Sequence, residues 1–298
     1  MIETDPALHL TKCVVALEST VIAHGLPRPL NLETARKLEE IVLDSNAFPA
    51  TVGIIGGRLK VGLNADEVRK LAEDDNIRKV STRDLPIAVA QGWDGATTVA
   101  TTCWIAQRAG VSVFATGGIG GVHRGALPDI SADLPELART PIVVVCSGAK
   151  IVLDLAATRE WLETHGVTVV GYQCDEFPAF YSLHSGLAVD ARANTPAEVA
   201  AIFQAQRRLG IDSALLVTVP VPEEFEVPAE RLDAVLKNAL EAAEQNDVNG
   251  RQLTPFLLAH MAKQSDGATL RANIALLENN ARVAAMIASD ISNLRLDI

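Results

Sequence analysis

The sequence predicts an α/β fold in which helices cover both faces of a β-sheet, and three observations indicate it. Hydrophobic residues make up 48% of the 298 residues and aromatic residues only 4%, so Ala, Val, Leu and Ile must fill most of the core. Such side chains dominate parallel strands that are buried on both faces. Short apolar runs alternate along the chain with amphipathic segments at helical spacing. Because no internal repeat or linker interrupts this alternation, we expect a single domain over residues 1–298.

The predicted strands are short apolar runs, and most of them end in small or polar residues. Gly56-Gly57 lies between two of these runs and indicates a tight hairpin. In chain order, the predicted strands are 13–17, 51–55, 58–63, 111–115, 142–146, 167–172 and 214–219.

The predicted helices show apolar residues at helical spacing and capping residues near their ends. Asn31 is a candidate cap for a helix that runs to about Ser45. Thr195-Pro196-x-Glu198 is a capping box with proline at the first helical position, and this helix should end by Gly210. The other predicted helices are 65–76, 85–92, 97–109, 151–165, 228–246 and 270–291.

Charge and cysteine content exclude several classes of function. The net charge of −11 argues against nucleic acid as a partner, because binding its backbone requires a basic surface. The four cysteines are scattered and form no CxxC pair, so we expect buried free thiols in a reducing compartment. Residues 1–10 do not resemble a signal peptide, and no apolar run is long enough to span a membrane. We therefore expect a cytoplasmic protein.

The most informative segment follows the predicted strand 111–115. Thr116 comes first, then Gly117-Gly118-x-Gly120-Gly121, and then His123 and Arg124. Glycine has no Cβ, so backbone amides there can approach a ligand closely. Hydroxyl, imidazole and guanidinium groups beside such amides suit a phosphate. The spacing differs from the dinucleotide-binding G-x-G-x-x-G motif, and the segment predicts a site for a small phosphorylated molecule.

Two other strand ends carry groups suited to covalent or acid–base chemistry. Lys150 follows the strand 142–146 and a small turn that contains glycine. Partial burial there favours the neutral amine, which can attack a carbonyl carbon and form a Schiff base. The alternative is an exposed lysine in the first turn of a helix. Glu18 follows the strand 13–17 and is either a general acid or base or a cap for the next turn.

Other polar residues leave a binding and a structural interpretation open. Asp129 and Asp133 can hold a divalent cation, which prefers one or two carboxylates plus waters, or can cap the turn that follows. Lys79 can pair with a phosphate or lie on a solvated face. Asn273 and Asn280 are seven residues apart and share one face of the last helix, where they can contact a ligand or hydrogen-bond a neighbouring loop.

Taken together, long blocks of the sequence resemble the pseudouridine-5′-phosphate glycosidase family, which includes the indigoidine synthase A-like proteins. The resemblance extends from about residue 13 to residue 290, and its specificity comes from the combination of blocks. These blocks are residues 16–20, 24–25, 60–63, 79–85, 94–100, 114–125, 129–134, 147–150 and 255–258.

The resemblance implies a three-layer α/β/α sandwich around a mixed sheet, and a homotrimer. Members of the family cleave the C–C bond between uracil C5 and ribose C1′ in the presence of Mn²⁺, and the products are uracil and ribose 5-phosphate. The chain is therefore expected to be a glycosidase of the lyase class, acting reversibly on pseudouridine 5′-phosphate. Neither nucleic acid nor a membrane is an expected partner.

The resemblance also implies a role for individual residues. Lys150 is expected to be the nucleophile that holds the opened sugar as an imine, and Glu18 the proton donor. Asp129 matches the metal-binding position. The residues that match substrate-contacting positions are Lys79, Val99, Ser131, Ala132 and Asp133, and those expected to hold the phosphate are Thr116, His123 and Asn273.

This chemistry agrees with the residue types. A C–C glycosidic bond has no leaving heteroatom to protonate, so a paired-carboxylate mechanism suits it poorly, whereas an iminium at C1′ provides an electron sink. The chain departs from the family pattern at residues 126–128, where the loop before Asp129 is shorter. Two alternatives are a related enzyme acting on another base, as expected of relatives in pigment synthesis, and a phosphosugar-binding regulatory protein.

Overall fold

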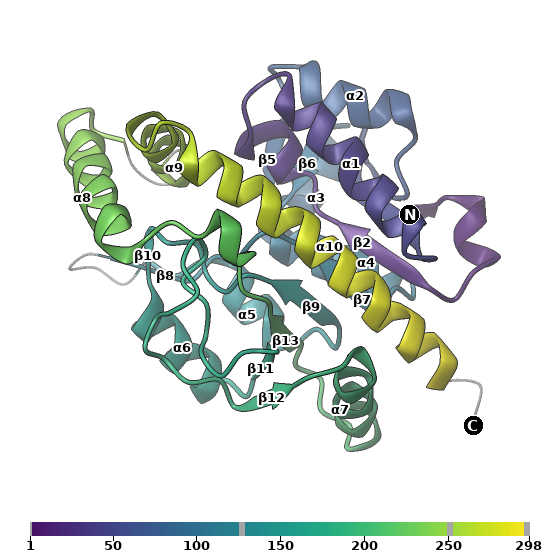
Figure 1. Ribbon diagram of the computed structural model, residues 1–298. Coiled ribbons are helices and arrows are strands. Elements are labelled where there is room, and N and C mark those ends of the chain that lie inside the picture. Colours follow the sequence, from purple (N-terminus) through teal and green to yellow (C-terminus); the bar gives the residue numbers. More distant parts are fainter. Residues whose placement is uncertain (1, 125–128, 249–252, 295–298) are drawn as a thin grey trace.

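The computed structural model, which describes residues 2–124, 129–248 and 253–294, has a mixed sheet between two layers of helices (Figure 1). The main path of the sheet has the order β1-β4-β3-β2-β7-β9-β13-β11-β12, and β6 pairs with β3 and β5. The strands from β2 to β12 along this path pair in parallel, whereas β3 is antiparallel to β4 and β6. The predicted three-layer α/β/α fold with a mixed sheet is confirmed.

The strands have the following bounds: β1 Ile2–Thr4, β2 Val14–Leu17, β3 Phe48–Ile55, β4 Arg58–Val61, β5 Arg78–Val80, β6 Gly95–Thr97, β7 Val113–Ala115, β8 Val122–His123, β9 Val143–Cys146, β10 Leu153–Asp154, β11 Thr168–Tyr172, β12 Ala191–Ala193 and β13 Leu215–Thr218. The predicted hairpin joins β3 to β4, and its Gly56 and Gly57 have φ angles of 56° and 76°. Positive φ at both turn positions is what a tight hairpin requires.

The α-helices have the following bounds: α1 Leu30–Asp44, α2 Ala65–Glu73, α3 Leu85–Ala90, α4 Val99–Arg108, α5 Asp133–Leu137, α6 Leu155–Thr164, α7 Pro196–Arg208, α8 Ala229–Gln245, α9 Leu253–Gln264 and α10 Ala268–Leu294. Short helical turns are η1 Pro6–His9, η2 Val21–Gly25, η3 Thr82–Asp84 and η4 Glu223–Phe225. Within the described ranges, no helix is long and apolar enough to cross a membrane.

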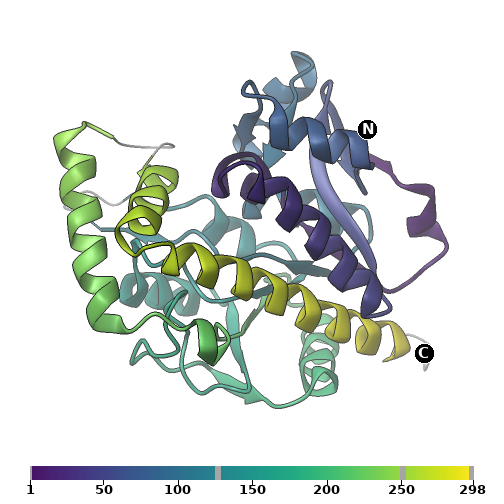
Figure 2. The ribbon, with the colours of Figure 1, turned by 45° about the horizontal axis from the view of Figure 1, so that its top comes forward.

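Helices cover both faces of the sheet. The long helix α10 crosses β2, β7 and β9 on one face, next to α1 and α7 (Figure 1). Helices α4, α5 and α6 lie on the other face. Helices α8 and α9 pack against each other at one end of the molecule, beyond the sheet (Figure 2).

Several local features differ from the sequence analysis. The helix expected from residue 151 begins at Leu155, because Leu153 and Asp154 pair with β8 as strand β10. Asn31 does not cap α1, which begins at Leu30; its amide is buried and donates to the carbonyls of Ile22 and Ala72, both at 2.9 Å. The helix expected from residue 97 begins at Val99, because residues 95–97 join the sheet as β6. Helix α9 was not predicted, since its residues show only a weak division into polar and apolar faces.

Candidate functional site

The predicted site residues converge at the carboxyl ends of three adjacent parallel strands. β2 pairs with β7, and β7 pairs with β9. Glu18 follows β2, Thr116 and the glycine-rich segment follow β7, and Lys150 comes four residues after β9. Ligands of open α/β sheets bind outside the carboxyl ends of the strands. The topology therefore brings together the groups that the sequence places after separate strands.

The loops after β7 and β9 are joined by backbone hydrogen bonds. Ser147 N–H donates to the Gly117 carbonyl at 2.8 Å, and Lys150 N–H donates to the Ile119 carbonyl at 3.1 Å. Gly148 has φ of 79°, and a Cβ added there would lie 2.2 Å from the Pro178 carbonyl oxygen. A glycine is required at this position, and the backbone that carries Lys150 is consequently fixed.

Asn280 on α10 forms hydrogen bonds with both of these loops. Its side chain is fully buried, and its amide donates to the Thr116 carbonyl at 2.8 Å and to Ser147 Oγ at 3.2 Å. Of the two interpretations left open by the sequence, Asn280 therefore takes the structural one. Asn273, two turns earlier on α10, instead lines a cavity.

Glu18 is held by two hydroxyl groups. Its side chain is only 6% exposed. Oε1 accepts a hydrogen bond from Thr116 Oγ1 at 2.5 Å, and Oε2 accepts one from Thr20 Oγ1 at 2.6 Å. Behind it, Ser19 Oγ donates to the Val52 carbonyl at 2.6 Å. Glu18 is therefore a positioned carboxylate rather than a cap for the following turn.

Two cavities meet at Glu18 and Lys150. The larger one, called the polar cavity below, has a volume of about 320 Å³, and the smaller one, called the inner cavity, about 60 Å³. Five residues line both: Glu18, Thr20, Lys79, Lys150 and Thr254. The amine and the acid expected to carry the chemistry thus share one junction, with Lys150 partly buried.

Most of the predicted site residues line these cavities. Those in the polar cavity, besides the shared ones, are Val99, His123, Asp129, Ser131, Ala132 and Asp133. Asn273 lines the inner cavity. Thr116 is 2% exposed and is found among the lining residues of neither, so the structure places its hydroxyl against Glu18 instead.

Asp133 connects the glycine-rich segment to the start of α4. Its buried carboxylate accepts hydrogen bonds from the N–H groups of Ala100 and Gly120, both at 2.9 Å. A Cβ at Gly120 would lie 2.6 Å from Asp133 Oδ2 and 2.2 Å from Ser131 Oγ. The close packing of these residues shapes the wall of the polar cavity.

The donor set near Asp129 fits a cation that retains most of its waters. Asp129 is exposed and lines the polar cavity together with Ser131, whereas both oxygens of Asp133 already accept backbone hydrogen bonds. Among the described residues, no group of three or more His, Cys, Asp or Glu side chains could enclose a metal ion. Mg²⁺ and similar hard cations are commonly held by one or two carboxylates plus water and substrate phosphate. The shortened loop at residues 126–128 lies outside the described residues.

The sequence analysis did not predict helix α9, which closes the site on one side and is called the roof below. Thr254 of α9 lines both cavities, and Pro255 and Leu258 line the inner one. His24 of η2 lines the inner cavity as well. Burial lowers the pKa of His24, and the positive charge of Lys79 lowers it further. The resemblance blocks at 24–25 and 255–258 include His24, Pro255 and Leu258, but nothing in the sequence analysis indicated Thr254.

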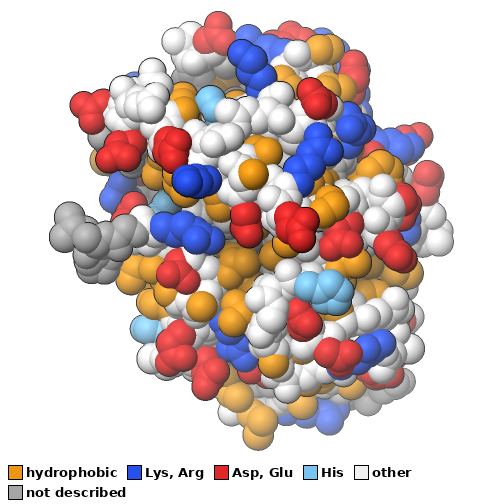
Figure 3. All heavy atoms as spheres, turned by 60° about the vertical axis from the view of Figure 1, so that its left-hand side comes forward, with side chains coloured by type: hydrophobic (Ala, Val, Ile, Leu, Met, Phe, Trp, Pro, Cys, Tyr) orange, Lys and Arg blue, Asp and Glu red, His pale blue; other side chains and the backbone are white. Residues whose placement is uncertain are grey.

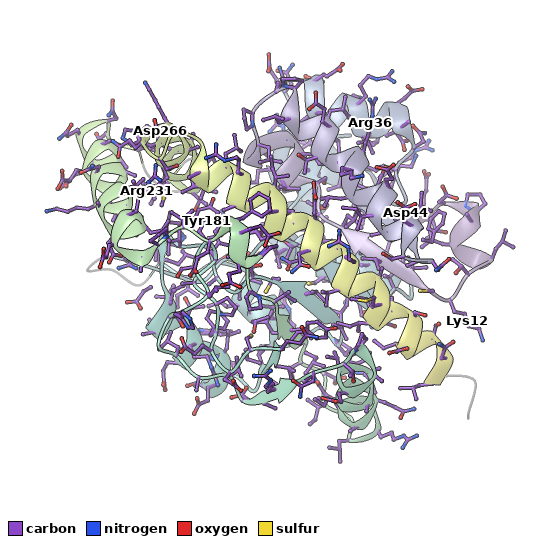
Figure 4. The ribbon with its side chains drawn as sticks, viewed as in Figure 1. Lys12, Arg36, Asp44, Tyr181, Arg231 and Asp266 are labelled. Atoms are coloured by element: carbon purple, nitrogen blue, oxygen red, sulfur yellow. The ribbon has the colours of Figure 1, made fainter. Side chains whose placement is uncertain are left out.

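The outer face around α8 and α9 carries mixed charge. Figure 3 shows acidic and basic side chains of the described residues interspersed on this side of the molecule. Arg231 of α8 reaches the turn between α9 and α10, where it donates to the Ser265 carbonyl at 2.9 Å and lies 3.7 Å from Asp266 (Figure 4).

Comparisons with known proteins give consistent matches. The family described as "Indigoidine synthase A like protein" matches residues 3–290. The pseudouridine-5′-phosphate glycosidase of Caldanaerobacter subterraneus is 48% identical, with 98% of this chain and 96% of that protein covered. The protein of that name from Hahella chejuensis is 50% identical, with 96% of each covered.

Two solved structures share the fold. An indigoidine synthase A-like protein from Thermotoga maritima is 38% identical, with a TM-score of 0.90, and the alignment covers 98% of this chain and 97% of that one. The prealnumycin C-glycosynthase AlnA, solved in complex with ribulose 5-phosphate, is 36% identical, with a TM-score of 0.92 and coverage of 100% and 99%.

Proposed function

The chain belongs to the indigoidine synthase A-like protein family, and from this premise we propose that it cleaves pseudouridine 5′-phosphate, reversibly, to uracil and ribose 5-phosphate. Relatives with this activity in their names are 48–50% identical over nearly the whole chain. The observation that carries the proposal is the junction of the two cavities, where Glu18 and Lys150 lie together. One acid and one amine are what the cleavage of a C–C glycosidic bond requires.

The bond changes can be assigned to these two side chains. Glu18 first takes a proton from the ammonium group of Lys150, which leaves a neutral amine. As the C1′–O4′ bond of the ribose breaks, Lys150 Nζ bonds to C1′ and passes one of its protons to O4′. Glu18 then protonates uracil C5. The nitrogen lone pair forms the C1′=N bond, and the electron pair of the C1′–C5 bond returns to the uracil ring, which leaves. Water hydrolyses the imine, which releases ribose 5-phosphate and regenerates the amine of Lys150.

The polar cavity suits the phosphate end of the substrate. Lys79 and His123 line it, and charge-assisted hydrogen bonds from such groups are the strong ones for phosphate. The proposed substrate contacts there are those implied by the resemblance: Lys79, Val99, His123, Ser131, Ala132 and Asp133. Thr116 acts in this scheme through Glu18, because its hydroxyl donates to that carboxylate.

We propose Mn²⁺ as the cofactor, held by Asp129. When bound, the ion would offset the negative charge of the substrate phosphate and help to hold it. The side chains at the junction, Glu18 and Lys150, carry out the bond changes described above. Calorimetric titration of the protein with Mn²⁺, with and without ribose 5-phosphate, tests this assignment: an Asp129→Asn variant should bind the ion more weakly.

Mass spectrometry of a borohydride-treated mixture tests the reaction and the nucleophile together. The protein is incubated with pseudouridine 5′-phosphate and Mn²⁺, reduced, digested and mapped. We expect free uracil and a reduced ribose phosphate adduct on Lys150, and neither with Lys150→Ala. Uracil without an adduct would contradict the imine. Absence of both, from folded protein with metal, would overturn the proposed function.

Two features of the protein's setting stay predictions. A homotrimer is implied by the family resemblance, and sedimentation equilibrium tests it. A cytoplasmic location is supported by four cysteines without disulfides, which suits a reducing compartment.

The similarity to a C-glycosynthase favours one alternative function, in which the lysine and the phosphate site are kept but the base differs. Parallel assays with other C-nucleotides distinguish the two.

A further inference from the structure

The connection between β11 and β12 carries an aromatic residue in a strained backbone conformation. Residues 176–188, called the supporting loop below, are closed at their ends by the antiparallel pairing of Glu176 with Ala188. Within this loop, Phe180 has φ of 64°. Among the described residues other than glycine, four more have positive φ, and three of these are Asn or Asp, which tolerate it. A bulky side chain in this conformation costs free energy, so the surrounding structure has to enforce it.

Contacts with η4 and the residues after it enforce this conformation. The Tyr181 carbonyl accepts a hydrogen bond from Val227 N–H at 2.9 Å. Glu226 Oε1 accepts from Ser182 Oγ and from the N–H of the next residue, both at 2.9 Å. Tyr181, which lies beside α10 in Figure 4, and Ser182 are buried. The three residues that follow Phe180 are therefore fixed, and its backbone cannot relax without breaking these contacts.

The ring of Phe180 packs against the loops that follow β7 and β9. Phe180 is 2% exposed. A Cβ added at Gly118 would lie 2.7 Å from this ring and 3.0 Å from the Gly148 carbonyl oxygen. Gly148 also forms an isolated antiparallel bridge with Ala179. The supporting loop thus contacts both of these loops close to the backbone of Lys150.

The loop after β7 links the acid of the site to its amine. Thr116 at the start of this loop donates to Glu18 at 2.5 Å, and the Ile119 carbonyl accepts from Lys150 N–H at 3.1 Å. The glycine that the aromatic ring contacts lies between these two points in the chain. A shift of this loop would change the placement of the amine relative to the acid. Misplacement of reacting groups by about 1 Å can lower a rate about 10²-fold.

Resting on the function proposed above, we propose that Phe180 is a positioning residue for the amine of Lys150 and that Glu226 acts through it. Glu226 holds the supporting loop in the conformation that packs the ring of Phe180 on the loop after β7. That loop then keeps the amine within reach of the sugar C1′. Glu226 is not among the described residues that line the inner or the polar cavity, so its role is separate from contact with the substrate.

Substitution of Glu226 tests this role from outside the cavities. Glu226→Ala removes the acceptor of both hydrogen bonds. The rate of adduct formation on Lys150 with saturating ribose 5-phosphate, trapped with borohydride, should fall about tenfold. The kcat for pseudouridine 5′-phosphate should fall in parallel, with KM within about twofold of wild type. Glu226→Gln keeps an acceptor oxygen and should restore most of the rate. Glu224→Ala, which changes an exposed carboxylate on η4, is the matched control and should leave both measurements unchanged.

Substitution at the ring tests the contact itself. Phe180→Leu keeps an apolar side chain but removes the ring, and adduct formation with ribose 5-phosphate should slow about 10–100-fold. Gly118→Ala places a methyl group against the ring from the other side and should give a similar loss. Because the two changes alter one contact, the loss in the double variant should be smaller than the product of the two single losses.

The possible failures can be distinguished. If Phe180→Leu slows cleavage but forms the adduct from ribose 5-phosphate at the wild-type rate, Phe180 contacts only the base, and the positioning role is wrong. A higher KM at constant kcat in Glu226→Ala, or single losses that simply multiply, would also overturn it. If Phe180→Leu does not fold, as judged by circular dichroism, the comparison of Glu226→Ala with Glu226→Gln gives the answer. If the wild type itself forms neither adduct nor uracil, the proposed function is wrong.

Discussion

The floor of the two cavities, formed by the loops after β2, β7 and β9, is held together by buried hydrogen bonds. Their roof, α9, is fastened at its far end through the exposed side chain of Arg231. In the floor, Glu18 accepts from Thr116, and Asn280 donates to the Thr116 carbonyl. None of these three residues is more than 6% exposed. At the end of the roof, Arg231 contacts Ser265 and Asp266, and the side chains of Arg231 and Asp266 are 48% and 95% exposed.

This difference indicates that the floor and the roof have separate roles in catalysis and in substrate binding. Groups that exchange protons or form bonds need a fixed geometry, which buried and fully bonded surroundings provide. Groups that only enclose a substrate tolerate looser attachment, and lids over active sites are drawn from the less stable parts of a protein. The floor should therefore control the rate of reaction and much of the stability, and the roof should control binding.

Replacing the amine at the junction should have the largest effect. Lys150→Ala removes the nucleophile, and uracil release should fall at least about 10³-fold, with the circular dichroism spectrum unchanged. Lys12→Ala, which changes a lysine far from the site (Figure 4), should keep wild-type activity. Residual cleavage within about tenfold of wild type would mean that the floor does not supply a covalent catalyst.

Replacing the acid should have the next largest effect. Glu18→Gln keeps the side-chain size and an oxygen that can accept from Thr116, but it removes the proton that uracil C5 requires. A positioned general acid contributes about 10²–10⁴-fold, so kcat should fall within that range while the protein remains folded. An unchanged kcat, measured at saturating substrate, would mean that another group donates the proton to uracil C5.

The longer buried strands and the residues of the junction could be predicted from the sequence, but short strands such as β5, β6 and β12 and the roof could not. Apolar runs identify β2, β7 and β9, and each exit carries a distinctive residue, so local pattern was sufficient there. Helix α9 has no clear polar face, because it covers a cavity on one side and packs against α8 on the other. The weak pattern thus follows from its position.

The contacts of some individual residues could not be predicted from the local sequence pattern either. Asn31 has the residue type of a helix cap, but tertiary contacts with Ile22 and Ala72 decide its place. Thr116 lies beside a glycine-rich segment of the kind that binds phosphate. Its hydroxyl reaches Glu18 because β2 and β7 pair in parallel, which the local sequence does not show. Both cases depend on strands and helices far apart in sequence.

Thr116→Val distinguishes a role in the floor from a direct role in phosphate binding. Valine has nearly the same shape as threonine but cannot donate to Glu18. Hydrogen bonds to charged groups contribute about 1.5–3 kcal/mol, so kcat should fall about 10–100-fold with little change in KM. A rise in KM at constant kcat would instead assign Thr116 to the substrate phosphate, as the family resemblance first suggested.

Asn280→Ala tests how far the floor contributes to stability. The change leaves the Thr116 carbonyl without this donor and opens a small cavity under both loops. An unsatisfied buried group costs about 1–3 kcal/mol, which urea unfolding can measure. Asn246→Ala, at the exposed end of α8, is the matched control, and its effect should lie within about 0.5 kcal/mol.

The smallest effect should come from the end of the roof. Arg231→Ala removes the contacts with Ser265 and Asp266, but exposed ion pairs contribute at most about 1 kcal/mol. The urea midpoint should hardly change, and kcat should stay at the wild-type value. Loosening of α9 should instead raise KM a few-fold, because Thr254, Pro255 and Leu258 would enclose the substrate less tightly. If Arg231→Ala destabilised the protein as much as Asn280→Ala, floor and roof would be one cooperative unit, and the division of work between them would not hold.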